Sequence, residues 1–187
     1  GASADAQVDR ALAVLDAHAA SEASAPLFLF LHLMDPHLPY DEGPDHQGLF
    51  AGEAPTPRTA GGLHEPVLKG ENAVRPLSRE ELAYLGDRYD QNVHAVDAVL
   101  ARLLPRLGPE DLVVVTSDHG EALGEHGEFG HGQGLTEEQV AIPLVVRGPG
   151  WAAGRSAEPV GLDDVGATLL AAVGVPAPVA ASGRDLA

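Results

Sequence analysis

The sequence contains no cysteine among its 187 residues. The chain therefore cannot form a disulfide, build a thiolate metal site or use a cysteine nucleophile. Cysteine usage also gives no information about the cellular compartment. Aromatic residues are scarce, at 4% of the chain, whereas hydrophobic residues make up 44%. Leucine, valine and alanine must therefore fill the core.

Basic residues are also few. The chain has 11 Lys and Arg residues and 28 Asp and Glu residues, which gives a formal net charge of −17. A chain this acidic repels phosphate backbones, so no nucleic-acid partner is expected. No apolar run reaches the roughly 18 residues that a transmembrane helix needs. The first four residues, Gly1–Ala4, lack the basic and apolar regions of a signal peptide. The length and the lack of internal repeats favour one domain.

The segment from Val113 to Glu121 carries the strongest functional signal. Its valines predict a buried strand, and Asp118, His119 and Gly120 follow where that strand ends. Ligands of open α/β sheets bind at the carboxyl ends of strands. A carboxylate oxygen and an imidazole nitrogen together suit Mn, Zn or Mg. The alternative is an Asp that caps a helix beside an incidental His.

A glycine-rich segment follows, with glycines at 120, 124, 127, 130, 132 and 134 and histidines at 119, 126 and 131. So many glycines disfavour both helix and strand, so we predict a loop that approaches a ligand closely. The alternative is a mobile surface loop with solvated histidines. A second apolar strand is predicted over residues 142–147, before the stop at Gly148-Pro149-Gly150.

Periodicity predicts the remaining elements. Helices are expected over residues 5–20, 78–107 and 162–174, the second opened by a capping box from Ser78 to Glu81. The apolar run Leu27–Leu33 predicts a strand buried on both faces of a parallel sheet. Residues 41–77 lack periodicity and predict a long loop over the site mouth. The order favours an α/β fold, a mostly parallel sheet flanked by helices.

Three ordered motifs resemble the sulfatase family of the alkaline phosphatase superfamily. The first comprises Thr116–Glu121, Gly124–Gly127, Gly130–Gly132, Glu137-Glu138 and Ile142–Gly150. The second is the segment Phe28–Tyr40, whose end resembles the Pro-His-x-Pro-Tyr segment of the family. The third is Gly161–Pro176, which resembles a family helix with an Asp-x-x-Pro-Thr-Leu-Leu pattern, although Gly166 and Ala167 precede Thr168 here. The resemblance runs from about residue 5 to the C-terminus and implies an alkaline-phosphatase-like fold, present as a partial domain.

The resemblance also implies roles for four residues. Asp118 and His119 occupy the positions of two metal ligands, for a divalent ion such as Ca, Mn, Mg or Zn. His37 matches the histidine that lines the ester pocket near the leaving group; the alternative is a turn histidine between prolines. His131 stands where many members have a lysine that contacts sulfate, work that an imidazole does only when protonated. Because His at position 119 is commoner in relatives that act on phosphorus esters, phosphoesters and phosphonates stay open as substrates.

Other histidines and acidic residues lack such support. We expect His126 to hydrogen-bond the backbone of the loop and His32 to be a core histidine. Asp35 is expected to fix a turn, and the acidic residues of the long helix, Asp87, Asp90 and Asp97, to form its solvated face.

The sequence lacks two features that the resemblance leads one to expect. No aspartate pair follows an N-terminal strand, and no Cys/Ser-x-Pro-x-Arg nucleophile motif occurs; Pro55-Thr56-Pro57-Arg58 has the wrong position and spacing. We therefore expect a fragment of a sulfatase-like domain that lacks its nucleophile and is inactive alone. Its parent would hydrolyse sulfate esters of a small molecule or glycan, and by resemblance be periplasmic or secreted. The alternatives are a phosphoester or phosphonate hydrolase, a phospho-group transferase, and a non-catalytic remnant or binding module.

Overall fold

The computed structural model describes residues 3–21, 25–40, 46–56, 76–132, 134–178 and 182–187. The chain divides into two compact units. Unit 1 comprises residues 1–108 and 120–140, and unit 2 comprises residues 109–119 and 141–187. The single domain expected from the length stays a prediction.

The two long helices of unit 1 begin at serine caps. Helix α1 spans Ala4–Ala20, and the Ser3 hydroxyl accepts a hydrogen bond from Ala6 N. Helix α3 spans Arg79–Leu103 and continues into a 3-10 turn, η1, at Leu104–Arg106. At its start the Ser78 hydroxyl accepts from Glu81 N, while the Glu81 carboxylate accepts from Ser78 N. This reciprocal pair confirms the predicted capping box.

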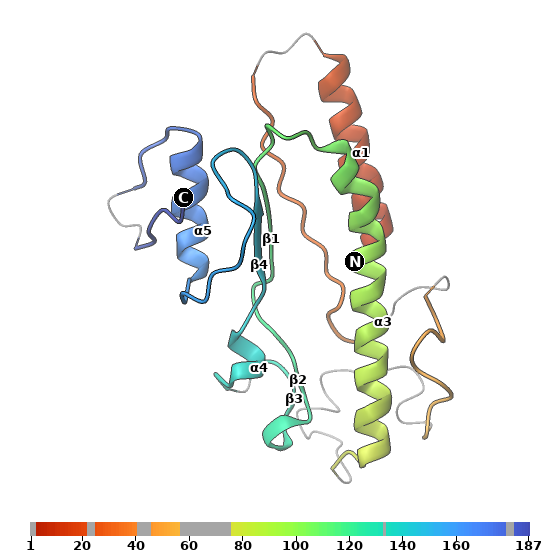
Figure 1. Ribbon diagram of the computed structural model, residues 1–187. Helices are drawn as coiled ribbons and strands as arrows, with labels where there is room; N and C mark the ends of the chain where they lie inside the picture. The colour runs from red at the N-terminus through yellow and green to blue at the C-terminus, as the bar shows by residue number, and fades with distance from the viewer. Residues whose placement is uncertain (1–2, 22–24, 41–45, 57–75, 133, 179–181) are drawn as a thin grey trace. The chain divides into compact units, whose positions relative to one another are not determined.

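Helices α1 and α3 lie side by side and run in the same direction (Figure 1). Apolar side chains of both helices form one core cluster: Ala4, Val8, Ala11, Val99 and Leu103. At its edge the Arg102 guanidinium donates to Asp5 and Asp9, and Arg106 donates to Asp16. These pairs are exposed and contribute little energy, so burial of the apolar cluster holds the helices together.

Three buried polar side chains on α3 were not predicted: Glu81, Gln91 and Asn92. The Gln91 Oε1 accepts hydrogen bonds from the backbone of Phe50 and Ala51, both at 2.9 Å. Glu81 Oε1 accepts from Thr56 Oγ1 at 2.9 Å. Residues 46–56 are therefore fixed to α3, and the rest of the predicted 41–77 loop lies outside the described residues.

A short hairpin completes unit 1. Strand β2, Ala122–Leu123, pairs antiparallel with β3, Phe129–Gly130, across the 3-10 turn η2 at Glu125–Gly127. Phe129 packs into a second core cluster, in which it joins Leu38, Tyr40, Ala51, Tyr84 and Leu85. The hairpin is thus anchored in the core through Phe129. The four-residue helix α4, Glu137–Val140, follows it.

Unit 2 contains strands β1, Val113–Thr116, and β4, Leu144–Arg147. They pair antiparallel, with Val113 opposite Arg147 and Thr116 opposite Leu144. The two strands are neighbours in one sheet, as the expected mostly parallel sheet requires, but their pairing is antiparallel. A parallel return needs a crossover, usually a helix of several turns. The chain between β1 and β4 instead forms the β2–β3 hairpin and the single turn of α4.

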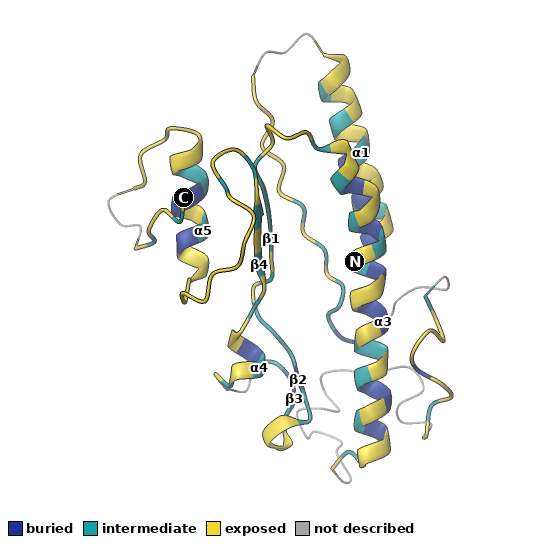
Figure 2. Cartoon of the chain, in the orientation of Figure 1, coloured by how far each residue is buried: buried dark blue, intermediate teal, exposed yellow. Residues whose placement is uncertain are grey.

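The segment Leu27–Leu33 does not form a strand in the structure, although it was predicted as one. It was also predicted to be buried on both faces, yet Phe28 is 76% exposed and Phe30 is 77% exposed. Figure 2 shows exposed residues along this segment, which follows α1. Leu31 and Leu33 alone pack against the cluster between α1 and α3. Described strand pairs are all antiparallel, so the mostly parallel sheet is not found in the described residues.

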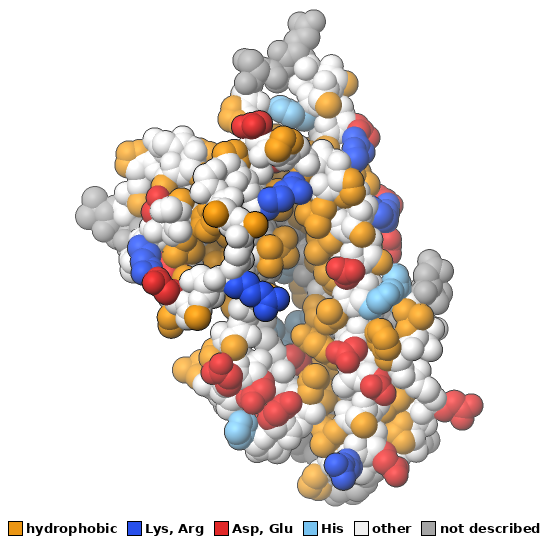
Figure 3. All heavy atoms as spheres, viewed as in Figure 1, with side chains coloured by type: hydrophobic (Ala, Val, Ile, Leu, Met, Phe, Trp, Pro, Cys, Tyr) orange, Lys and Arg blue, Asp and Glu red, His pale blue; other side chains and the backbone are white. Residues whose placement is uncertain are grey.

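Helix α5, Leu162–Ala172, organises the C-terminal part of unit 2. The Asp164 carboxylate accepts from Gly161 N and Arg184 N, and Thr168 Oγ1 accepts from Leu186 N at 3.0 Å. The Asp164 and Thr168 side chains, one helical turn apart, therefore fix residues 184–186 along the helix. The few basic side chains are scattered over the face drawn in Figure 3. None of the described helices has the length and apolar character needed to cross a membrane.

Candidate active site

Asp118 and His119 lie in unit 2, directly after β1. The Asp118 Oδ1 accepts a hydrogen bond from His119 N at 3.1 Å and lies 3.8 Å from His119 Nε2. The Asp118 side chain is 78% exposed and that of His119 is 39% exposed. The Asp therefore does not cap a helix; it turns back onto its own neighbour. Its exposed carboxylate is accessible to a ligand.

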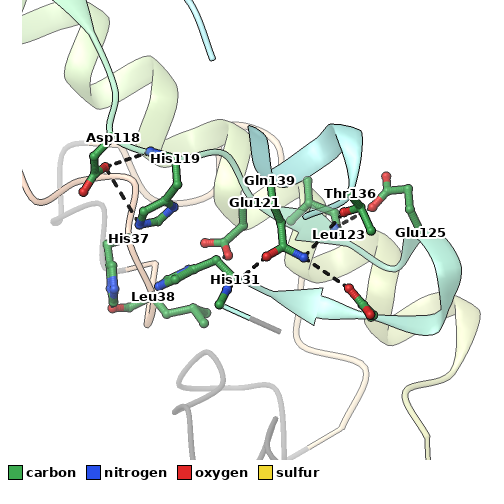
Figure 4. A network of polar contacts seen from close by, with 12 residues as sticks. His37, Leu38, Asp118, His119, Glu121, Leu123, Glu125, His131, Thr136 and Gln139 are labelled. Atoms are coloured by element: carbon green, nitrogen blue, oxygen red, sulfur yellow. Dashed lines mark hydrogen bonds and ion pairs between the residues drawn. The ribbon is translucent and has the colours of Figure 1, made fainter. Parts of the chain in front are cut away.

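His37 and His131 lie together in unit 1, with ring centroids 4.9 Å apart and an interplanar angle of 66°. His37 Nδ1 donates to Leu38 O at 2.7 Å. This assigns the hydrogen to Nδ1, because a carbonyl oxygen only accepts. His131 Nδ1 lies 2.9 Å from Glu121 Oε1, and His131 stands between Glu121 and His37 (Figure 4). The structure thus brings together two histidines that are 94 positions apart.

Asp118 and His119 belong to one unit, and His37 and His131 to the other. The motifs of the sequence predict that all four side chains converge on one pocket, and this stays a prediction. What the structure establishes is two pairs, each formed within its own unit.

Tyr40 lies close to Glu121, the carboxylate that contacts His131. Its side chain is fully buried and packs edge-to-face on Tyr89 and Phe129. Burial raises the pKa of the Tyr40 hydroxyl, and the negative charge of Glu121 raises it further. The hydroxyl therefore stays protonated at any physiological pH. Arg88 donates to the Tyr40 carbonyl and, at 3.3 Å, to the Tyr84 hydroxyl, which fixes this end of the Pro-His-x-Pro-Tyr segment.

Gln139, on α4, fixes the glycine-rich loop. Its side chain accepts from Gly132 N at 3.0 Å and donates to Glu128 Oε2 at 3.1 Å, and its backbone carbonyl accepts from Gly120 N at 2.9 Å. A Cβ on Gly120 would lie 2.2 Å from the carbonyl oxygen of Glu138. Only glycine therefore fits at position 120. These contacts fix the loop backbone and argue against a mobile loop, although the His126 side chain is 65% exposed.

Two other expectations about histidines are wrong. His32 was expected in the core, but it is exposed and contacts Phe30 edge-to-face, because the segment that carries it is not part of a sheet. His126 was expected to hydrogen-bond the loop backbone. It instead adopts a positive φ of 56° in an exposed turn, and its Nε2 lies 3.6 Å from Glu138 Oε1. The three acidic residues of α3, Asp87, Asp90 and Asp97, are exposed as predicted.

The donor chemistry of Asp118 and His119 fits a divalent ion. The number of donors does not complete a site, because the described residues hold no group of three or more His, Cys, Asp or Glu side chains suited to a metal. Catalytic metal sites usually take three or more protein ligands. The pair can therefore supply part of a ligand set.

Comparison with known proteins identifies the family. The family model described as Sulfatase matches residues 1–175. The chain belongs to the sulfatase family. Over 173 residues it is 30% identical to a protein of Drosophila melanogaster named extracellular sulfatase SULF-1 homolog, a match that covers 86% of this chain and 15% of that sulfatase. The chain thus spans a small part of this relative's length.

Two solved structures share the fold. A phosphonate monoester hydrolase from Silicibacter pomeroyi has a TM-score of 0.72 and 25% identity, over 96% of this chain and 39% of that one. The protein BT4656, solved with its substrate D-glucosamine-2-N,6-O-disulfate, has a TM-score of 0.71 and 20% identity, over 100% of this chain and 51% of that one. These likenesses confirm the predicted alkaline-phosphatase-like fold class, although the described sheets of this sulfatase-family chain are antiparallel.

Sequence reasoning missed Glu121, Gln139 and Tyr40. Glu121 stands in the Asp-His-Gly-Glu motif that drew attention to Asp118, but nothing in the sequence shows that it meets His131. A buried glutamine cannot be distinguished from an exposed one by spacing. Tyr40 ended a recognised motif, which was a usable signal.

Proposed function

We propose that this chain supplies part of the active site of a metal-dependent hydrolase of sulfate esters. The match of the family model to residues 1–175 carries the proposal. The exposed Asp118–His119 pair after β1 and the His37–His131 pair support it, because they are the residue types that sulfate ester hydrolysis requires.

In this proposal Asp118 and His119 are two ligands of a divalent ion. When bound, the ion would withdraw charge from the sulfuryl oxygens. His37 and His131 would contact the ester, one near the leaving oxygen and the other at a sulfuryl oxygen. Each ring is held through Nδ1, so Nε2 is the nitrogen that exchanges a proton with the ester.

A second candidate is hydrolysis of phosphonate or phosphate esters. Two observations favour it: the 25% identity to the phosphonate monoester hydrolase, and a histidine rather than an asparagine at position 119. Sulfate and phosphonate monoesters share a tetrahedral centre with charged oxygens, so one site can accept both classes. Their relative rates separate the two candidates.

These 187 residues contain neither cysteine nor a Ser-x-Pro-x-Arg motif, which supports the proposal that the nucleophile lies outside them. Covalent catalysis fails without an attacking group. We therefore propose that residues 1–187 alone are inactive, and that a polypeptide which also carries such a motif is active.

The experiment compares residues 1–187 with that longer polypeptide on aryl sulfate, aryl phosphate and aryl phosphonate esters, with Mn, Mg, Ca or Zn added. Asp118→Asn should lower turnover of the longer form by at least about a hundredfold, because it weakens a metal ligand. Asp97→Asn, at an exposed site on α3, is the matched control and should keep full activity. If residues 1–187 alone hydrolyse an ester and Asp118→Asn abolishes that activity, the nucleophile lies inside this chain.

We also propose a glycan or small-molecule substrate and a secreted or periplasmic location. The sulfated glucosamine in the BT4656 complex supports the first, and the name of the extracellular Drosophila relative supports the second.

A further inference from the structure

Glu121 is a buried carboxylate that the proposed function leaves without a role. Its side chain is 5% exposed, and its Oε1 lies 2.9 Å from His131 Nδ1, whose side chain is 16% exposed. A buried charge needs a partner, and a buried ion pair contributes little net stability compared with apolar packing. The contact is therefore better explained by its effect on His131 than by stability.

The contact fixes the tautomer of His131. A carboxylate accepts hydrogen bonds and donates none when ionised, so Nδ1 of His131 carries the hydrogen. His37 is held in the same way, since its Nδ1 donates to the Leu38 carbonyl. Both rings of the pair are thus anchored through Nδ1, and in each ring Nε2 points away from its anchor. Free imidazole prefers the opposite tautomer, so the protein imposes this arrangement.

A second observation places the charge of Glu121 inward. Tyr40 is fully buried, and the negative charge of Glu121 is the second cause, after burial itself, that raises the pKa of its hydroxyl. The Glu121 carboxylate therefore lies near both the Tyr40 side chain and the His131 ring, inside the unit. Carboxylates that hold one nitrogen of a histidine commonly orient the other nitrogen toward a metal or a reacting group.

We propose that Glu121 is the positioning residue of His131. It holds the imidazole through Nδ1 so that Nε2–H of the protonated ring donates to an oxygen of a tetrahedral anion, the sulfuryl group of the ester. This deepens the proposed function and rests on its assignment of His131 to the ester. Glu121 itself does not touch the substrate.

The test is two-bond ¹H–¹⁵N correlation spectroscopy of the imidazoles in the ¹⁵N-labelled 187-residue chain. The parent should show His131 with hydrogen on Nδ1. Glu121→Gln keeps an acceptor oxygen and should preserve that tautomer, whereas Glu121→Met keeps the volume without the acceptor and should shift His131 toward the Nε2–H form. His37 should not change in either variant, because its anchor is a backbone carbonyl. Glu137→Gln, an exposed glutamate on α4, is the charge-matched control.

A second measurement connects the orientation of the His131 ring to function. Sodium sulfate is titrated into the same proteins, in buffer acidic enough to protonate imidazole, while the His131 Nε2 signal is followed. Sulfate affinity should fall about tenfold in Glu121→Met, the loss expected for a charge-assisted hydrogen bond that is no longer aligned, and stay within about twofold in Glu121→Gln.

Three outcomes would overturn the proposal: a parent whose His131 carries hydrogen on Nε2, a Glu121→Met spectrum identical to the parent's, or sulfate that leaves the His131 signal unmoved. None of these readings depends on turnover. Failure of the proposed function would appear instead in the ester assay: the longer polypeptide would not hydrolyse the esters, or Asp118→Asn would not lower its turnover. The two failures are therefore distinguishable.

Discussion

Replacing Gly120 with alanine tests whether the loop is fixed as described. The new Cβ would lie 2.2 Å from the Glu138 carbonyl oxygen, which is backbone and cannot rotate away. Helix α4 must then shift, and the hydrogen bond from Gly120 N to Gln139 O, 2.9 Å long, is weakened. Overpacking costs about 1–3 kcal/mol, and the hydrogen bond adds about 1 kcal/mol. We expect the free energy of unfolding to fall by about 2–4 kcal/mol.

The matched control is Gly86→Ala, in the middle of α3. A Cβ there meets nothing within 4 Å. Alanine should therefore stabilise the helix by about 0.5–1 kcal/mol, so the two substitutions have opposite signs. Urea unfolding followed by far-UV circular dichroism measures both. If Gly120→Ala is as stable as the parent, α4 does not pack against this glycine and the described loop is incorrect.

The remaining predictions concern the core, the docked segment and the C-terminal contacts. Leu85→Ala, at a fully buried site, should lower the free energy of unfolding by about 2–5 kcal/mol in the same assay; a loss under about 1 kcal/mol would contradict the burial. Gln91→Ala should leave the N–H groups of Phe50 and Ala51 unpaired, so limited proteolysis should cut near them sooner than in the parent; an unchanged cleavage rate would mean that other contacts hold the segment. Hydrogen bonds from two backbone N–H groups hold the pKa of Asp164 below its ordinary value of 3.8, so its stabilisation is present above that pH and is lost as the pH falls through the lowered value. The stability difference between the parent and Asp164→Asn should therefore be present at neutral pH and vanish in strong acid, as thermal unfolding across pH would show; a difference that persists in acid would contradict this.

Local signals predicted the helices well because each is encoded within a few residues. Ser78 and Glu81 lie one turn apart, so the capping box is visible in the sequence and forms as expected. The apolar spacing of α1 likewise needs no knowledge of its partner. The register of α3 is less readable from the sequence: helical spacing of apolar residues predicts a buried stripe that includes Val93, yet Val93 is 44% exposed and Gln91 and Asn92 are buried.

Strand direction and pairing could not be predicted, because they depend on contacts far apart in sequence. The valines of β1 and β4 indicate strands, yet neither run indicates whether its partner strand is parallel or antiparallel. The run Leu27–Leu33 has the composition of a buried strand, but the described residues supply no neighbouring strand for it. Its phenylalanines are exposed for that reason.

In the site, as in the fold, features encoded by neighbouring residues could be predicted, whereas contacts between residues farther apart in sequence could not. Glycine spacing predicted a loop that approaches its neighbours closely, and Gly120 does meet the backbone of α4. What fixes that loop is Gln139, whose side-chain and backbone partners lie between 3 and 19 positions away. Because a glycine-rich backbone has little conformational preference of its own, these hydrogen bonds, together with the Glu121–His131 contact, determine where His131 points. Substitutions at Gln139 and Glu121 should therefore alter the imidazole before they alter the fold.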